Sequence, residues 1–147
     1  MVIKINNIFV YGSLRPDFTS SISNIVHNNP KFKFNYYKAL LPYTKMYYQR
    51  STGYAIAIHN LKLYSKEDHI IGYILQTENI DEALKVFDEI EECPQVYERY
   101  VTQCLNTENN KEENAYFYSV KENFDKSSLI QLNLNDFKNF DKKNYLL

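Results

Sequence analysis

The chain has 147 residues, of which 44% are hydrophobic and 24% charged, and its net charge at neutral pH is −1. This composition is ordinary for a globular protein and argues against disorder, and the length suits one domain, which we expect to span residues 1–147. The balanced charge predicts neither a nucleic-acid nor a membrane partner, and no apolar run is long enough to cross a bilayer. Since the N-terminus also lacks the pattern of a secretory signal, we expect a cytoplasmic protein.

The first predicted strand runs from about Val2 to Val10 and ends at the loop Tyr11-Gly12-Ser13-Leu14. Gly12 has no Cβ, so it can adopt a positive φ and let a ligand approach the backbone closely. The loop amides leave the sheet here, and such amides can hold an anionic or carbonyl oxygen. An ordinary turn after a strand has the same pattern, so the loop alone leaves both interpretations open.

A short helix is predicted after this loop, because apolar residues recur at helical spacing between Phe18 and Val26. Gly72 lies within a later apolar run, where a glycine marks a bulge or a close backbone approach. The stretch from Asn60 to Asp68 is polar and predicts a loop. Alternation or apolar runs predict strands at residues 32–37, 54–58 and 70–75.

The clearest helix begins at Ile80, with Asn79 as the expected N-cap and Glu82 completing a capping box. Glu91 falls three turns later and within about 20° of the apolar stripe, if the helix runs that far. A carboxylate on an apolar face is costly unless it is paired, so such a residue is usually kept for a reason. The pattern leaves equally open that Pro94 ends the helix early and that Glu91 is solvated.

The remaining chain predicts two more strands, at residues 97–105 and 115–120, which pair antiparallel across a polar loop at 106–114. A short helix is expected between Asp136 and Phe140. Strands outnumber helices and the two main helices are separated by several strands. We therefore predict an α+β fold with a small mixed sheet that resembles a β-barrel, flanked by two main helices.

Metal and nucleophile chemistry find little support in the sequence. Cys93 and Cys104 have no partners at metal-ligand spacing, and we interpret them as packing residues or free thiols. His27, His59 and His69 lie in polar contexts with no Ser or Cys partner, so we expect solvated histidines and no catalytic triad. A phosphate-binding glycine loop with its lysine is also missing. The prediction is a protein without metal or cofactor.

Three motifs occur in register along the chain: Tyr11-Gly12-Ser13-Leu14, Phe87-Asp88-Glu89-Ile90-Glu91 and Tyr97-Glu98-Arg99. Together they resemble the gamma-glutamylcyclotransferase-like superfamily, in particular the branch that contains gamma-glutamylamine cyclotransferase and the AIG2-like proteins. The tail Asp136-Phe137-Lys138 also resembles the Asp-Trp-Arg ending of that branch. Glu92 stands where the family has glycine, so the chain must turn out of the helix without glycine's flexibility.

The resemblance implies a gamma-glutamylcyclotransferase-like enzyme without cofactors. In this reaction the α-amine of a γ-glutamyl group attacks its own side-chain carbonyl, which yields 5-oxoproline and a free amine or amino acid. The resemblance implies Glu91 as the general acid/base, and its expected place on an apolar helix face favours the same role. The backbone from Tyr11 to Leu14, including Gly12 and Ser13, would bind substrate oxygens, and we expect Tyr118 to reach the substrate. Asp88 is expected to organise the helix end and Arg99 to pair with a carboxylate.

Two other functions are compatible with parts of the sequence. One is a non-catalytic AIG2-like module that binds a small ligand or a protein. The other is a nucleic-acid-binding barrel with stacking tyrosines, which the lack of a basic stripe disfavours. For the enzyme, the partner is a small γ-glutamyl substrate, and the group attached to it stays open, as does the oligomeric state.

Overall fold

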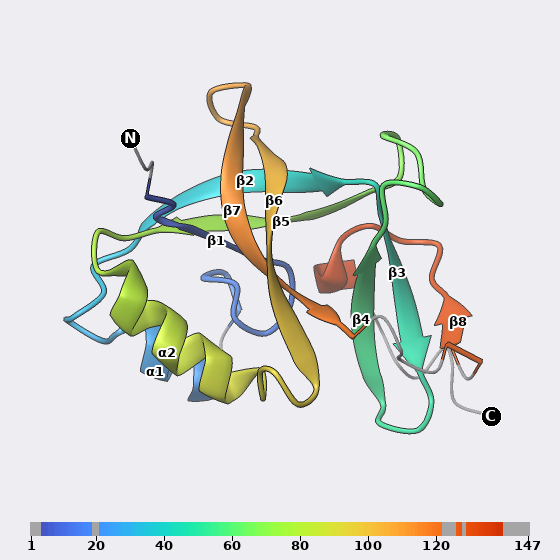
Figure 1. The fold of residues 1–147 in the computed structure, drawn as a ribbon, viewed down its shortest axis with the longest axis horizontal. Coiled ribbons are helices and arrows are strands. Elements are labelled where there is room, and N and C mark those ends of the chain that lie inside the picture. The colour runs from blue at the N-terminus through green and yellow to red at the C-terminus, as the bar shows by residue number, and fades with distance from the viewer. Residues whose placement is uncertain (1–3, 19–20, 122–125, 128, 140–147) are drawn as a thin grey trace.

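The computed structural model describes residues 4–18, 21–121, 126–127 and 129–139. Five strands close into a mixed barrel, because β1 pairs antiparallel with β5 on one side and parallel with β7 on the other (Figure 1). The predicted α+β class and barrel are therefore confirmed. Around the barrel the strands are β1 (Asn7–Val10), β5 (His69–Gln76), β2 (Asn35–Pro42), β6 (Tyr97–Asn106) and β7 (Lys111–Val120).

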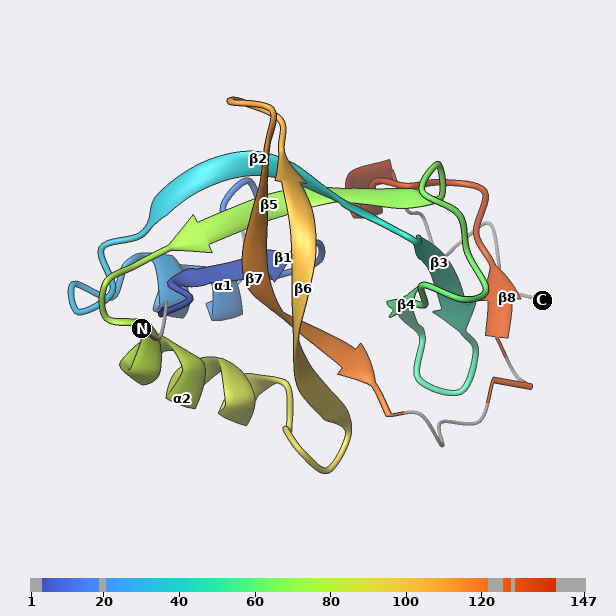
Figure 2. The ribbon, with the colours of Figure 1, turned by 45° about the horizontal axis from the view of Figure 1, so that its top comes forward.

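A second sheet of three strands stands beside the barrel, as Figure 2 shows. Its order is β4 (Tyr54–His59), β3 (Thr44–Gln49) and β8 (Leu129–Gln131). Tyr43 joins β2 to β3 with a φ of 57°, and this left-handed residue turns the chain from the barrel into the second sheet. The sequence patterns missed β3 and β8, since β8 is only three residues long and β3 follows β2 after a single residue.

Two helices and one 3₁₀ turn complete the fold: α1 (Ser21–His27), α2 (Ile80–Ile90) and η1 (Phe137–Asn139). The predicted stripe of α2 is buried against β1, β5 and α1. The predicted side-chain cap at Asn79 is wrong, because its amide Nδ2 donates to the Lys31 carbonyl, 3.1 Å away. Among the described residues no helix has the length and apolar character needed to cross a membrane.

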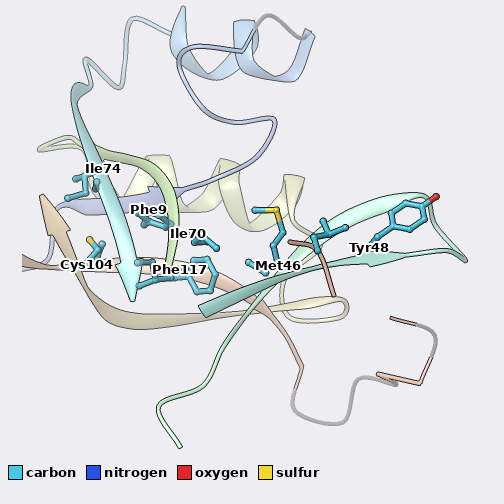
Figure 3. Close-up of a cluster of buried hydrophobic side chains, with 12 residues drawn as sticks. Phe9, Met46, Tyr48, Ile70, Ile74, Cys104 and Phe117 are labelled. Carbon is cyan, nitrogen blue, oxygen red and sulfur yellow. The ribbon is translucent and has the colours of Figure 1, made fainter. Parts of the chain in front are cut away.

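The main core runs from the barrel interior into the second sheet. Phe9, Ile70 and Phe117 come from barrel strands, and Met46 and Tyr48 extend the same cluster from β3 (Figure 3). This shared core holds the second sheet against the barrel.

The glycine in β5 confirms the predicted close approach. A Cβ on Gly72 would lie 2.2 Å from the Val10 carbonyl oxygen and 2.7 Å from the Phe9 ring, so β1 passes too near for any side chain. β5 continues through this residue in unbroken register with β2, without a bulge.

Several predicted boundaries differ from the structure. β1 begins at Asn7, and residues 2 and 3 of the predicted first strand lie outside the described residues, as does Phe140 of the predicted tail helix. The predicted loop at 106–114 is wrong, because β6 extends to Asn106 and β7 already begins at Lys111. Backbone hydrogen bonds extend this hairpin through polar, mostly exposed residues, which carry no apolar signal.

Candidate functional site

A cavity of about 620 Å³ opens where the end of β1, the end of α2 and the second sheet meet. Its size suits a small metabolite. Loop 11–14 and Glu91, which are nearly eighty positions apart in the sequence, line this same cavity. Further walls come from the β3–β4 hairpin, β7 and η1 through Gln49, Thr52, Phe117, Tyr118 and Phe137.

Glu91 occupies the C-cap position of α2. Its backbone remains close to helical, with φ −85° and ψ 2°, and its N–H donates to the Phe87 carbonyl at 2.9 Å. The helix thus stops at Ile90, as the Pro94 alternative allowed, but Glu91 continues the turn of the helix. Glu91 lines the cavity and is half-buried, so of the two alternatives left open the solvated glutamate is wrong.

The next residues close α2 with a Schellman motif. The Glu92 N–H donates to the Glu89 carbonyl at 3.2 Å, and the Cys93 N–H donates to the Asp88 carbonyl at 2.8 Å. Glu92 takes the left-handed position of this motif, with φ 51°. This is the conformation that glycine adopts most readily, and here the chain makes the turn with a glutamate.

The surroundings of Glu91 change its acidity. Burial raises the pKa of its carboxyl group from 4.5 to about 7. None of the described residues forms a hydrogen bond or an ion pair with this carboxylate. Near neutral pH the group is therefore divided between its two protonation states, and it can both accept and donate a proton.

Tyr11 presents a hydroxyl group to the same cavity. Its oxygen accepts the Ala57 N–H at 3.0 Å, which leaves the hydroxyl proton available for another acceptor. Burial, followed by the neighbouring Tyr97 and Glu91, raises the pKa of Tyr11, so the hydroxyl remains protonated. Tyr11 is thus a hydrogen-bond donor within the site.

The loop after Tyr11 is a turn in which the Arg15 N–H donates to the Gly12 carbonyl at 3.0 Å. The conformational reason given for Gly12 is wrong, because its φ is not positive. Gly12 instead leaves open space in the cavity, since a Cβ on this residue would meet no atom within 4 Å. The amides of Gly12 and Leu14 have no acceptor among the described residues, and Ser13 is exposed at the rim.

Tyr118 borders the cavity with its ring, and the side chain is only 6% exposed. The ring stacks on Phe87 at 6.4 Å, while the hydroxyl donates to Asp88 at 2.5 Å. Arg99 donates to the other oxygen of Asp88 at 2.6 Å. The prediction that Arg99 pairs with a carboxylate is therefore confirmed, while the Asp88 side chain ties α2 to β6 and β7. Contact between Tyr118 and substrate stays a prediction that now concerns its ring.

Arg15 was not predicted as a residue of structural importance. Arg15 is 3% exposed and binds two carboxylates, with two contacts to Asp17 at 2.6 and 2.9 Å and one to Asp136 at 2.5 Å. Phe137 follows Asp136, lines the cavity and packs on Phe18 at 5.7 Å. The family-like tail at 136–138 gave no sign of a contact with Arg15, and hydropathy cannot reveal a buried arginine.

The histidines differ from the expected solvated residues. His27 Nε2 lies 2.6 Å from the Leu14 carbonyl and so links α1 to the loop of the site. His59 lies between Thr44 and Thr102, at 2.8 and 3.1 Å. Their partners are distant in sequence, which explains why a local pattern could not find them. No group of three His, Cys, Asp or Glu residues in the described ranges could hold a metal ion.

The family described as "Gamma-glutamyl cyclotransferase, AIG2-like" matches residues 8–139, and the chain belongs to this family. No curated protein sequence matches the chain.

Solved structures with the same fold include a protein from Arabidopsis thaliana, which is 22% identical and has a TM-score of 0.64 over 97% of this chain and 87% of its own. An AIG2-like protein from Mus musculus is 15% identical, with a TM-score of 0.64 over 86% of this chain and 83% of its own. A gamma-glutamyl cyclotransferase is 20% identical, with a TM-score of 0.59 over 86% and 71%. At these identities the likeness shows the shared fold.

Proposed function

We propose that this protein is a cyclotransferase that converts a γ-glutamyl amine or amino acid to 5-oxoproline and the free amine. The α-amine of the substrate attacks the γ-carbonyl carbon, a C–N bond closes the five-membered ring, and the C–N bond to the leaving amine breaks. The family match supports this general kind of reaction. The observation that carries the proposal is the half-buried Glu91 in one cavity with the loop from Tyr11 to Leu14.

Glu91 would act as the general acid/base. The substrate amine arrives as an ammonium ion and must lose a proton before it can attack, and the leaving nitrogen must gain one. A carboxyl group with a pKa of about 7 is a far better proton acceptor near neutral pH than one at 4.5, and its protonated form then donates to the leaving nitrogen. One residue can thus move the same proton from the first nitrogen to the second.

The cavity wall formed by loop 11–14 would bind the oxygen atoms of the substrate. The Tyr11 hydroxyl and the amides of Gly12 and Leu14 are donors that can bind the substrate carboxylate or the oxyanion of the tetrahedral intermediate. Aromatic walls from Phe117 and Tyr118 would exclude water and favour a folded substrate. Because both reacting groups belong to one molecule, holding this conformer provides much of the acceleration.

The test is release of 5-oxoproline from γ-glutamyl amides of alkyl amines and amino acids. We expect activity in the parent protein and a loss of about 100-fold or more in Glu91→Gln, the scale of general acid/base catalysis. Glu89→Gln is the matched control, because it removes the same charge from an exposed position outside the cavity at the same helix end. An equally active Glu91→Gln variant would refute the assigned role.

A non-catalytic binding module makes a different prediction in the same experiment. It would bind γ-glutamyl compounds without releasing 5-oxoproline, and Glu91→Gln would then change affinity alone. Calorimetric titration beside the activity assay separates these two functions.

A further inference from the structure

We infer that Glu92 makes this protein selective for γ-glutamyl amines whose leaving group carries a positive charge, an inference that rests on the proposed function. Glu92 lines the same cavity as Glu91 but is exposed, so it stands toward solvent at the mouth. Glu92 would contact the part of the substrate that departs, whereas Glu91 acts on the two reacting nitrogens.

The charge of the cavity is the first argument. Among its described lining residues, Glu91 and Glu92 are the charged ones, and none is a lysine or arginine. Arg15, Arg50, Lys121 and Lys138 follow lining residues in the sequence but do not line the cavity, and Arg15 is paired with two carboxylates. The field at the mouth therefore attracts a cation and repels an anion.

The order of the two acids gives the second argument. In the proposed reaction Glu91 serves both the attacking amine and the leaving nitrogen, and we place the leaving group between Glu91 and the exposed Glu92, which both line the cavity. Glu92 is the next residue along the chain and has the more exposed side chain. A second carboxylate beside the attacking amine would instead hold it as an ammonium ion and oppose the reaction.

The backbone supports a role for this side chain. Glu92 has a φ of 51° in the Schellman motif, where glycine would be less strained. The helix-ending turn fixes the Cα of Glu92 beside that of Glu91 through the Glu92 and Cys93 amides.

The experiment uses three γ-glutamyl amides of four-carbon amines, namely 1,4-diaminobutane, butylamine and 4-aminobutanoate. The far ends of their leaving groups are cationic, neutral and anionic. We expect kcat/KM to decrease in that order. In Glu92→Gln the ratio of the cationic to the neutral substrate should fall about threefold to fivefold, the size of one solvent-screened charge pair. High salt should reduce the same ratio in the parent protein.

Glu89→Gln is again the matched control and should leave the ratio unchanged, because Glu89 lies outside the cavity. Binding of the corresponding glutaryl amides, which lack the α-amine and cannot cyclise, gives a measurement that does not require turnover. The cationic glutaryl amide should bind the parent protein more tightly than the neutral one. This difference in affinity should be smaller in Glu92→Gln.

The outcomes separate the two proposals. Turnover of all three substrates without a charge preference, or an equal loss on all three in Glu92→Gln, overturns the inference about Glu92 alone. Charge-selective binding of the glutaryl amides without any 5-oxoproline from the γ-glutamyl amides overturns the proposed reaction. It still supports the preference of the cavity mouth for a cationic group.

Discussion

Arg15 and Asp136 meet at 2.5 Å, although 121 positions separate them in the sequence. The guanidinium of Arg15 is almost fully buried and also stacks over the rings of Phe18 and Tyr73. This contact fastens the residue that follows loop 11–14 to the segment that carries Phe137, and both loop 11–14 and Phe137 line the cavity.

The first prediction concerns this ion pair. Asp136→Asn should lower the free energy of unfolding by about 1–3 kcal/mol, because a buried cation loses one of its two carboxylates. Urea denaturation measures the change. Lys4→Gln, which breaks an exposed pair at 3.7 Å, should cost less than about 0.5 kcal/mol. Equal effects of the two substitutions would show that burial does not strengthen the Arg15 contact.

Two glycines should respond oppositely to alanine. Gly12→Ala should leave the melting temperature nearly unchanged but raise KM, because the new methyl group meets no protein atom and occupies cavity space. Gly72→Ala should destabilise the fold by roughly 2–3 kcal/mol, because its Cβ would overlap the Val10 carbonyl. Thermal unfolding and steady-state kinetics distinguish these effects. An unaltered KM in Gly12→Ala would remove Gly12 from the substrate site.

The buried acid should destabilise the protein at high pH. The folded-state pKa of Glu91 is about 7 against 4.5 for an unperturbed carboxyl, so folding disfavours the ionised form. Below about pH 4.5 both states bind the proton and there is no penalty, and the penalty grows until the pH passes about 7. Glu91→Gln should therefore be more stable than the parent by about 1–3 kcal/mol at pH 8, and by much less at pH 5. A constant difference across this range would contradict the raised pKa.

The same group should control the pH dependence of activity. As the general base, Glu91 is active in its ionised form, so kcat/KM should rise with pH and level off above about 7. Initial rates of 5-oxoproline release between about pH 5 and 8.5 give the profile. A rate that does not change through this range would exclude Glu91 as the titrating base.

Glu92 allows a test of backbone strain separate from its charge. Glu92→Gly should stabilise the fold by about 1 kcal/mol, because glycine tolerates the φ of 51° without the steric cost of a Cβ. Glu92→Gln keeps the Cβ and should leave stability nearly unchanged. Denaturant unfolding of both variants at equal pH decides whether the conformation is strained.

Much of the site was predictable because its motifs are local in sequence. The stripe of α2 placed Glu91 on the side that faces the barrel, and the end of β1 placed Gly12 in a loop. The role of Gly12 was misjudged, since sequence cannot tell a glycine that needs a positive φ from one that leaves space. Arg15 and His27 were missed or misassigned because their partners, Asp136 and the Leu14 carbonyl, are brought to them only by the fold.

The cavity takes walls from early and late parts of the chain, with Tyr11 near one end of the sequence and Phe137 near the other. During synthesis on the ribosome, Arg15 emerges long before Asp136 exists, so the pocket assembles only after residues 136 and 137 have been translated. A bound metabolite can therefore protect finished copies against unfolding and proteolysis, whereas copies that stop before residue 136 gain no such protection.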